Sequence, residues 1–513
     1  MNGAEVLVAT ALQAGVEVCF ANPGTTELPL VAALDGEPGV RPVLGLFEGV
    51  VTGAADGYAR MTAAPALTLL HLGPGFANGI ANLHNARRAY SPIVNIVGDH
   101  ATWHRPYDAP LTSDIESLAR PVSGWVRQTA TSSDLAADVA DAIAAARSHG
   151  GQVATLVVPA DCQWGESGPP ARPRAITPPA AVPDDAVRAV AKVLSSGEPA
   201  ALMLGAAGLT AAGLRLAGRI ASATGCRLFT EKSPARVDRG ADLPAPERLA
   251  YFPEDATRML GGVAHLILAG ARPPVTFFAY PEAPSSETPA GTAEHRLAAP
   301  RDDIIGALAY LADLVGNDRP PVPKAVARPE LPGGELDPAT AAMTLAAMQP
   351  AEAIVVNEAT TMARAYFSAS AGAAPHTVLS LTGGAIGQGL PSALGAAIAC
   401  PDRPVIAYQA DGSALYTSQA LWTMARERLD VTVLILSNRR YRILEVESER
   451  AGVQRPGAAS TRLTQLDDPA INWVSLANGY GVDARSASTT EELESALTAA
   501  FPEPGPHLVE VVL

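Results

Sequence analysis

The 513-residue chain has few cysteines and no long apolar run. Its cysteines, Cys19, Cys162, Cys226 and Cys400, are far apart and form no Cys-x-x-Cys pair, which argues against a zinc site and against a disulfide framework. No apolar run approaches the roughly 18 residues that a membrane-spanning helix needs. The first basic residue is Arg41, so the N-terminus lacks the positive segment of a secretory signal. These absences predict a soluble, cytoplasmic protein.

Basic residues are in the minority, with 37 Lys and Arg against 52 Asp and Glu and a net charge of −15. This balance favours neither a nucleic-acid partner nor an anionic membrane. The Gly-x-Gly-x-x-Gly pattern of dinucleotide-binding domains is also missing. The nearest stretch, from Gly387 to Ser392, ends in Ser instead of Gly and has a proline just before it. Because no Walker A sequence occurs either, the chain gives little support to a nicotinamide dehydrogenase or a P-loop enzyme.

Two Pro-rich stretches, Gly168 to Asp184 and Arg319 to Pro338, divide the sequence. They predict three domains of comparable size, at residues 1–167, 185–318 and 339–513. Each segment alternates short β-type runs with helical patterns rich in Ala and Leu. This alternation predicts three doubly wound α/β domains with parallel sheets.

Two polar residues follow apolar runs in the third segment. Asp411 follows the run Val405 to Tyr408, Asn438 follows the run Val431 to Leu436, and a helical pattern lies between the runs. A strand–helix–strand crossover puts both strands in one sheet, so we expect the two side chains to converge. Their oxygens suit Mg²⁺, and the following helix offers free N–H groups to a phosphate. For either residue alone a turn is the simpler interpretation, but the pair favours a diphosphate held through magnesium.

This stretch resembles the thiamine-diphosphate (ThDP) motif, which opens Gly-Asp-Gly and closes Asn-Asn. Asp411 and Asn438 have the family's separation. The resemblance implies that Mg²⁺ is bound by Asp411, Asn438 and the main-chain carbonyl of Arg440. It also implies that the diphosphate is bound by Thr360, Thr361, Gly412, Ser413 and Tyr441. For Thr360, helix capping is the commoner explanation.

Three positions depart from the family's pattern, namely Ala410 for Gly, Ser437 for Asn and Arg439 for the usual Gly. None of them removes a metal ligand. Gly at the third position serves a backbone angle that Arg adopts less easily, so the conformation of this loop is open. Arg439 and Arg440 could instead add positive charge near the diphosphate.

Glu48 opens a helical pattern, and alone it is explained as a carboxylate favoured by the helix dipole. In the ThDP family, however, a glutamate precedes an Ala-Ala-Asp-Gly-Tyr-Ala-Arg helix, which Ala54 to Arg60 reproduces. The resemblance implies that Glu48 hydrogen-bonds the aminopyrimidine ring and promotes its imino tautomer. The Gly-rich segment Gly383 to Pro391 aligns with the family's segment. This implies that the Gly384 carbonyl holds the amino group and that Ile386 lies under the rings, although Ile386 also suits core packing.

A Pro-Gly loop after the first predicted strand resembles a loop of benzoylformate decarboxylase. The resemblance assigns Asn22 and Pro23 to the cofactor and gives Thr25 the place of a substrate-binding serine. His71 matches an active-site histidine of that decarboxylase, although a lone histidine at a strand end is more often structural. The Gly-Pro-Gly that follows resembles acetolactate synthase. Phe278 stands near the position of the decarboxylase's second histidine, where it can line a substrate pocket but cannot transfer protons.

The sequence therefore resembles ThDP- and Mg²⁺-dependent enzymes, acetolactate synthase large subunits and benzoylformate decarboxylases in particular. The resemblance implies decarboxylation of a 2-oxo acid and coupling of the enamine to a second carbonyl, giving an acyloin or acetohydroxy acid. Because Phe278 replaces the second histidine, carboligation is favoured over simple decarboxylation, which stays the alternative. An inactive ThDP-binding paralogue that regulates a partner is a second alternative, and the intact Glu48 speaks against it.

The central segment keeps Gly270-Ala271-Arg272 but lacks the flavin-contact sequences of acetolactate synthases, so FAD is unlikely on sequence grounds. In the family, the residues matching Glu48 and Asp411 come from different subunits. A homodimer or homotetramer that acts on small molecules is therefore implied by resemblance.

Overall fold

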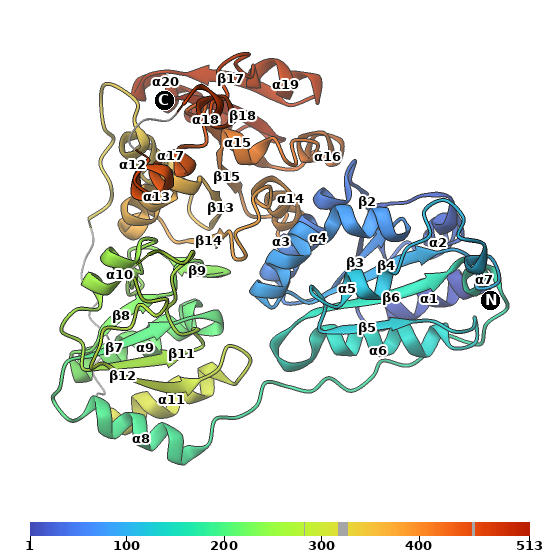
Figure 1. Ribbon diagram of the computed structural model, residues 1–513, viewed down its shortest axis with the longest axis horizontal. Coiled ribbons are helices and arrows are strands. Elements are labelled where there is room, and N and C mark those ends of the chain that lie inside the picture. The colour runs from blue at the N-terminus through green and yellow to red at the C-terminus, as the bar shows by residue number, and fades with distance from the viewer. Residues whose placement is uncertain (282, 317–326, 454–456) are drawn as a thin grey trace. The chain divides into compact units, whose positions relative to one another are not determined.

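The computed structural model describes residues 1–281, 283–316, 327–453 and 457–513. The chain forms two compact units (Figure 1). The first contains Met1–Thr177, Glu330–Tyr366 and Leu381–Leu513, and the second contains Pro178–Pro329 and Phe367–Ser380. Residues 319–326 of the second Pro-rich stretch lie outside the described residues, and the predicted domain boundaries stay a prediction.

The N-terminal part of the first unit contains a six-stranded parallel sheet in the order β2-β1-β3-β4-β6-β5. Strands β3, β4 and β6 are buried along their whole length, as in sheets covered on both faces. The strands are β1 (Val18–Asn22), β2 (Arg41–Leu44), β3 (Ala66–Leu70), β4 (Ile93–Asp99), β5 (Trp125–Gln128) and β6 (Val153–Pro159).

Helices cover both faces of this sheet (Figure 1). One face forms an apolar core with α1 (Gly3–Gln13), α2 (Leu28–Asp35) and α6 (Leu135–Arg147). The other face packs against α3 (Glu48–Thr62) and α4 (Leu72–Ala89). Two short helices, α5 (Ile115–Ala119) and α7 (Ala160–Trp164), complete this part.

Helix α3 is buried for most of its length because α14 (Gly389–Ala399) packs closely against it. A Cβ at Gly57 would lie 2.1 Å from the Ser392 carbonyl oxygen, and a Cβ at Gly395 would lie 1.9 Å from the Ala54 carbonyl oxygen. Glycine is therefore required on both helices where their backbones meet. This contact joins the N-terminal and C-terminal parts of the first unit.

The C-terminal part of the first unit contains five parallel strands in the order β17-β18-β16-β15-β13. These are β13 (Ala353–Glu358), β15 (Val405–Ala410), β16 (Val431–Ser437), β17 (Asp483–Ala487) and β18 (His507–Val512). The further helices are α12 (Pro338–Met348), α13 (Ala363–Ala369), α15 (Asp411–Ala414), α16 (Ala420–Glu427), α17 (Arg442–Arg450), α18 (Ala458–Thr464), α19 (Trp473–Gly479) and α20 (Thr490–Ala500).

The second unit contains a five-stranded parallel sheet in the order β10-β8-β7-β11-β12. Alternate residues of β7 face two separate apolar cores, so the sheet is covered on both sides. An antiparallel pair, β9 (Arg236–Arg239) and β14 (His376–Ser380), also lies in this unit. The other elements are β7 (Ala200–Leu204), β8 (Arg227–Thr230), β10 (Glu247–Arg248), β11 (His265–Ala269), β12 (Ala293–Ala298), α8 (Asp184–Leu194), α9 (Ala211–Thr224), α10 (Pro253–Met259) and α11 (Ile304–Val315).

The predicted class, three α/β domains with parallel sheets, is confirmed. One predicted helix is wrong in detail, because two short helices, α15 and α16, replace the single helix expected after Asp411. The chain turns between them, where Thr417 donates a hydrogen bond to the Gly387 carbonyl at 2.9 Å and Tyr416 packs beside Gly387. The Gly-rich segment therefore contacts the turn between the two helices.

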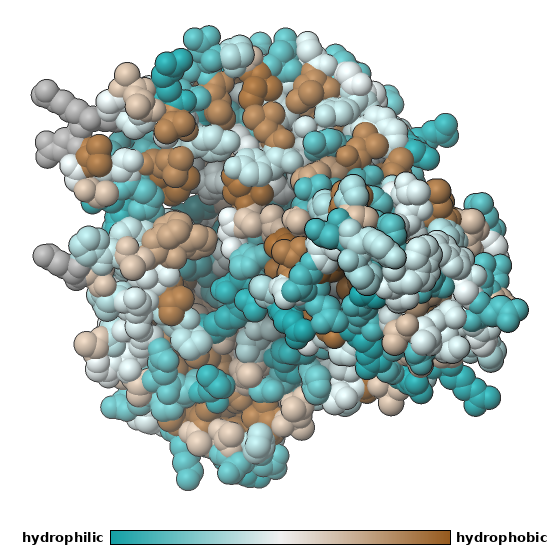
Figure 2. Space-filling view, turned by 45° about the vertical axis from the view of Figure 1, so that its right-hand side comes forward, coloured by the Kyte–Doolittle hydropathy of each residue, from teal (hydrophilic) through white to brown (hydrophobic). Residues whose placement is uncertain are grey.

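Hydrophobic side chains are exposed in small groups between hydrophilic ones on the face drawn in Figure 2. Exposed aromatic side chains include Trp103, Tyr107 and Phe278. Within the parts of the chain that the structure describes, no helix combines the length and the apolar character needed to cross a membrane.

Candidate active site

Asp411 and Asn438 lie at the same edge of the C-terminal sheet. Strands β15 and β16 are parallel, with Ala410 opposite Leu436, and the two polar residues directly follow these strands. The buried Asp411 carboxylate accepts hydrogen bonds from the N–H groups of Gly412 at 2.8 Å and Arg439 at 2.6 Å. Burial raises the pKa of Asp411, and these N–H donors oppose the rise.

The loop after β16 adopts the backbone conformation of the family's glycine, although Arg stands at residue 439. Arg439 has φ +55°, in the left-handed region that favours glycine. Two hydrogen bonds hold it there, one from its own N–H to Asp411 and one from the Leu466 N–H to its carbonyl at 2.7 Å. The Asn438 side-chain oxygen accepts a hydrogen bond from the Arg440 N–H at 3.2 Å.

This donor set fits Mg²⁺. The Asp411 carboxylate, the Asn438 amide oxygen and the Arg440 carbonyl are hard oxygen donors, and a carboxylate has lone pairs beyond the two used by N–H groups. Across the described residues, no group of three or more His, Cys, Asp and Glu side chains could hold a metal. Mg²⁺ commonly takes its remaining ligands from phosphate oxygens and water, so a set of three protein oxygens is compatible with it.

The residues predicted to bind diphosphate lie around Asp411 and after β13. A Cβ at Gly412 would lie 2.6 Å from the Tyr441 ring, so the glycine lets the two segments meet. The Ser413 hydroxyl bonds the Ala410 carbonyl at 3.0 Å. Thr360 and Thr361 are exposed, and the short helix that they begin has no side-chain cap, so the capping explanation for Thr360 is wrong.

A buried carboxylate that sequence reasoning missed, Glu358, fixes the Gly-rich segment. It accepts hydrogen bonds from three successive N–H groups, of residues 387–389, at 2.8, 3.3 and 2.6 Å. The Gln409 side chain donates a fourth at 2.8 Å. Burial raises the pKa of Glu358, and these donors oppose the rise. The sequence signal that could have indicated Glu358 was its position at the end of an apolar run, in Asn357-Glu358.

Glu48 begins α3 and is largely buried. The side-chain amide of Asn78, on α4, donates to its carboxylate at 3.0 Å. One turn further along α4, the Asn82 amide donates to the carbonyls of Gly49 at 2.8 Å and Gly387 at 3.3 Å. Helix α4 therefore links Glu48 to the Gly-rich segment within the first unit.

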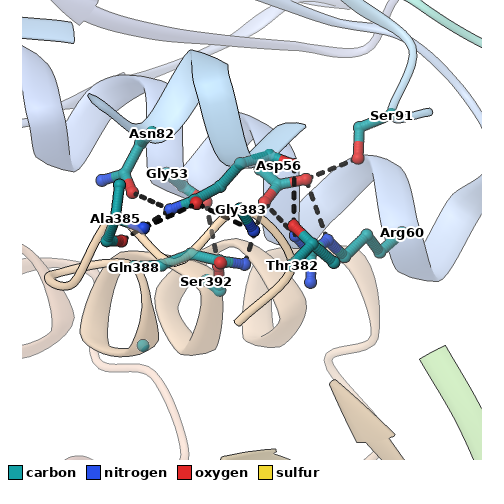
Figure 3. Close-up of polar contacts among 12 residues, drawn as sticks. Gly53, Asp56, Arg60, Asn82, Ser91, Thr382, Gly383, Ala385, Gln388 and Ser392 are labelled. Atoms are coloured by element: carbon teal, nitrogen blue, oxygen red, sulfur yellow. Dashed lines mark hydrogen bonds and ion pairs between the residues drawn. The ribbon is translucent and has the colours of Figure 1, made fainter. Parts of the chain in front are cut away.

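A buried polar network supports this junction between α3 and α14 (Figure 3). Arg60 binds Asp56 through two hydrogen bonds, at 2.9 and 2.6 Å, and donates to Thr382 at 3.0 Å. Asp56 also accepts from Ser91 at 2.5 Å and from Gln388 at 3.0 Å. The paired charges and the further hydrogen bonds offset the desolvation cost of burying both groups.

His71 pairs with a second carboxylate that sequence reasoning missed. Glu27 is fully buried and lies 2.7 Å from His71 Nδ1. The same carboxylate accepts from the Gly24 N–H at 2.9 Å and from the Thr26 hydroxyl at 2.5 Å. Thr26 lies 3.4 Å from the histidine, whereas Thr25 is exposed. The sequence signal for Glu27 was its place in the Pro-Gly loop.

The profile described as "Thiamine pyrophosphate enzyme, N-terminal TPP binding domain" matches residues 1–118. The profile described as "Thiamine pyrophosphate enzyme, C-terminal TPP binding domain" matches residues 358–511. A Mycobacterium tuberculosis protein named "Putative acetolactate synthase large subunit IlvX" is 52% identical over 100% of this chain and 99% of its own length. The chain belongs to the thiamine-diphosphate-dependent enzymes.

Two further relatives of this ThDP-dependent enzyme are decarboxylases by name. Benzoylformate decarboxylase of Pseudomonas aeruginosa is 32% identical over 97% of this chain and 96% of its own. The solved structure of the ThDP-dependent 4-hydroxybenzoylformate decarboxylase of Rhodococcus jostii RHA1 is 27% identical, with a TM-score of 0.89. It covers 99% of this chain and 98% of its own.

Four remaining residues keep their roles in this ThDP-dependent enzyme as predictions. Asn22 ends β1 opposite Leu70, so it lies beside the strand that leads to His71, and Pro23 follows it. Ile386 is half-buried in the Gly-rich segment. Phe278 belongs to the second unit, where it is 55% exposed and packs edge-on against Phe277 with ring centres 5.1 Å apart.

Proposed function

We propose that this enzyme binds ThDP through Mg²⁺, decarboxylates a 2-oxo acid and couples the remaining fragment to a second carbonyl compound. The product is an acyloin or an acetohydroxy acid. The observation that carries the proposal is the meeting of Asp411 and Asn438 at one edge of the C-terminal sheet, where their oxygens suit Mg²⁺. The relative named as an acetolactate synthase subunit, with 52% identity over the whole chain, supports the coupling step.

When bound, ThDP would supply a carbon acid whose deprotonated form adds to the substrate carbonyl, and an electron sink for decarboxylation. Before that addition, Glu48, oriented by the Asn78 amide, would exchange a proton with the pyrimidine ring. The carbonyl of Gly384 would accept a hydrogen bond from the 4′-amino group. Ile386 would pack against the rings.

The other end of the cofactor is assigned to the C-terminal sheet. Asp411, Asn438 and the Arg440 carbonyl would hold Mg²⁺, which would supply positive charge next to the diphosphate. The diphosphate contacts are assigned to Thr360, Thr361, Gly412, Ser413 and Tyr441. Asn22 and Pro23 are assigned to the pyrimidine side.

His71 is assigned a proton-transfer role toward the substrate. The buried Glu27 carboxylate fixes the orientation of its ring, as a carboxylate does for catalytic histidines in general. Thr25 and Phe278 are assigned to substrate contact. Phe278 has no ionisable group, which favours a coupling reaction over one that needs a second proton donor.

A non-oxidative decarboxylase, which releases an aldehyde, is the second candidate. The two relatives named as decarboxylases favour it. Both candidates share the removal of CO₂ from a 2-oxo acid, and they differ only in the fate of the remaining fragment.

Incubation of the purified protein with ThDP, Mg²⁺ and a panel of alkyl, aryl and indolyl 2-oxo acids tests the proposal. CO₂ release together with coupled products in the mass spectrum supports the carboligase. CO₂ release with aldehyde alone supports the decarboxylase. ThDP binding without CO₂ release from any acid would favour a non-catalytic partner protein instead.

The proposal includes a homodimer or homotetramer, because family members build the site between subunits. Light scattering of the purified protein measures this directly. Full activity in a solution that contains only monomers would contradict it.

A further inference from the structure

Helix α4 carries a row of asparagines at residues 78, 82 and 85, a spacing that places all three on one face. The first binds the Glu48 carboxylate, and the second binds the Gly387 carbonyl. The third, Asn85, is fully buried and binds backbone groups of Gly383 and Ala385 in the Gly-rich segment.

Asn85 uses every hydrogen-bonding site of its side-chain amide. Its oxygen accepts from the N–H groups of Gly383 at 3.1 Å and Ala385 at 3.3 Å. Its nitrogen donates to the Ala385 carbonyl at 2.7 Å and to the Asn82 side-chain oxygen at 3.2 Å. An amide with two donors and two lone pairs satisfied in this way has one orientation.

The backbone carbonyls of residues 383, 384 and 385 differ in their hydrogen-bond partners. His84 lies 3.1 Å from the Gly383 carbonyl oxygen, and Asn85 binds the Ala385 carbonyl. Between them, the carbonyl of Gly384 accepts no hydrogen bond from any residue that the structure describes. Gly384 is half-buried and has φ +80°, a backbone conformation that favours glycine.

We infer that Asn85 is a positioning residue that fixes the backbone on both sides of Gly384 and so aims the Gly384 carbonyl at the 4′-amino group of ThDP. The inference rests on the proposed function, which assigns that carbonyl to the amino group. Because the clamp forms on folding, the acceptor is oriented before the cofactor arrives, and binding need not order the loop.

The binding test compares ThDP with the analogue in which hydrogen replaces the 4′-amino group. In the presence of Mg²⁺, we expect the wild-type protein to prefer ThDP by roughly tenfold, the scale of one lost hydrogen bond that leaves the half-buried Gly384 carbonyl without its partner. In Asn85→Ala the Gly384 carbonyl is no longer held toward the 4′-amino group, so the ratio of the two dissociation constants falls to about threefold or less. Asn85→Ser carries the same expectation if Asn85→Ala does not fold.

Asn95→Ala is the matched control. Asn95 is equally buried, on β4, and bonds Thr68 at 2.7 Å and Thr155 at 2.9 Å, far in sequence from the Gly-rich segment. It should lose stability and keep the wild-type ratio. An Asn85 variant that also keeps the ratio would overturn the inference.

Hydrogen exchange of the cofactor-free protein tests the clamp separately. Peptides covering residues 381–390 should exchange faster in Asn85→Ala and at the wild-type rate in Asn95→Ala, and equal rates in all three proteins would overturn the clamp. A wild-type protein that binds neither compound contradicts the proposed function. If the wild-type protein prefers ThDP and Asn85→Ala keeps this preference, the inference is contradicted and the proposed function is not.

Discussion

Buried carboxylates of the first unit differ in what surrounds them, and the differences indicate their tasks. Glu358 is saturated by backbone N–H groups and a glutamine, so it has a structural task at the start of α14. Glu48 accepts from one side-chain amide, that of Asn78. A largely buried carboxylate with this sparse support is stabilised when a ring nitrogen donates to it, which suits a role in proton exchange.

Glu48→Gln should lower turnover of the best 2-oxo acid by roughly 100-fold or more, because Gln keeps the shape but cannot exchange the proton. ThDP should still bind, since the metal ligands are unchanged. Steady-state kinetics and a ThDP titration measure both effects. Glu116→Gln, at a half-buried position on α5, is the control, and wild-type turnover in Glu48→Gln would remove Glu48 from the mechanism.

Glu27→Gln should lower turnover by roughly tenfold, less than the change at Glu48, because the histidine stays but loses its charged partner. The Gly24 N–H can still donate to the new side-chain oxygen, so the loop should remain folded. Kinetics with a 2-oxo acid, alongside a His71→Ala variant, measure the effect. Unchanged turnover in both variants would exclude His71 from proton transfer.

The sequence predicts site residues that belong to a contiguous motif, and these stay predictions, whereas it does not indicate residues whose place depends on distant contacts. Glu48 and Asp411 stand next to recognisable helix and turn patterns. Glu27 acquires its role from a histidine 44 residues away, and Glu358 from N–H groups 29 to 31 residues away. Neither partnership has a periodicity or spacing that a single sequence reveals.

At the scale of elements, strands were easier to predict than helices. The apolar run Val431 to Leu436 is strand β16 with one residue added at its end, because a buried parallel strand is continuously apolar. The break between α15 and α16 could not be predicted, since it comes from Gly387 packing beside Tyr416. Local patterns set an element's type, whereas its ends depend on which segment packs there.

One element-scale prediction concerns the second unit, where Lys232, after β8, forms a buried ion pair with Glu287. Burial lowers the pKa of Lys232 and raises the pKa of Glu287, so keeping both charges has a desolvation cost. The lysine also donates to the carbonyls of Tyr251 at 3.1 Å and Val275 at 3.2 Å, which ties two loops to the end of β8.

Lys232→Met should lower the free energy of unfolding by about 3–5 kcal/mol, because it leaves the Glu287 carboxylate buried without its cation. Lys232→Met combined with Glu287→Leu should lower it by less than the single change. Urea unfolding measures all three proteins. The exposed pair Arg227 and Glu247 is the control, since Arg227→Gln should change stability by about 1 kcal/mol or less, and an equally small effect at Lys232 would contradict the buried-pair argument.

At the scale of the whole molecule, the first unit brings together chain segments from both ends of the sequence. Glu48 and Asn85 come from the N-terminal part, and the Gly-rich segment and Asp411 come from the C-terminal part. In the proposed oligomer, a ligand that contacts the N-terminal part of one subunit and the C-terminal part of another binds only the folded protein. Its binding energy therefore adds to the stability of the folded protein.

ThDP with Mg²⁺ should raise the midpoint of thermal unfolding by several degrees, because a ligand at about 100 times its dissociation constant contributes about 2.7 kcal/mol. Removal of the metal with EDTA should cancel most of the rise. Asp411→Ala should show no rise at the same concentrations, since it removes the charged metal ligand, whereas the exposed Asp402→Ala should respond as wild type does. A full rise in Asp411→Ala would mean that the diphosphate is held without this carboxylate, and the metal would have to be assigned elsewhere.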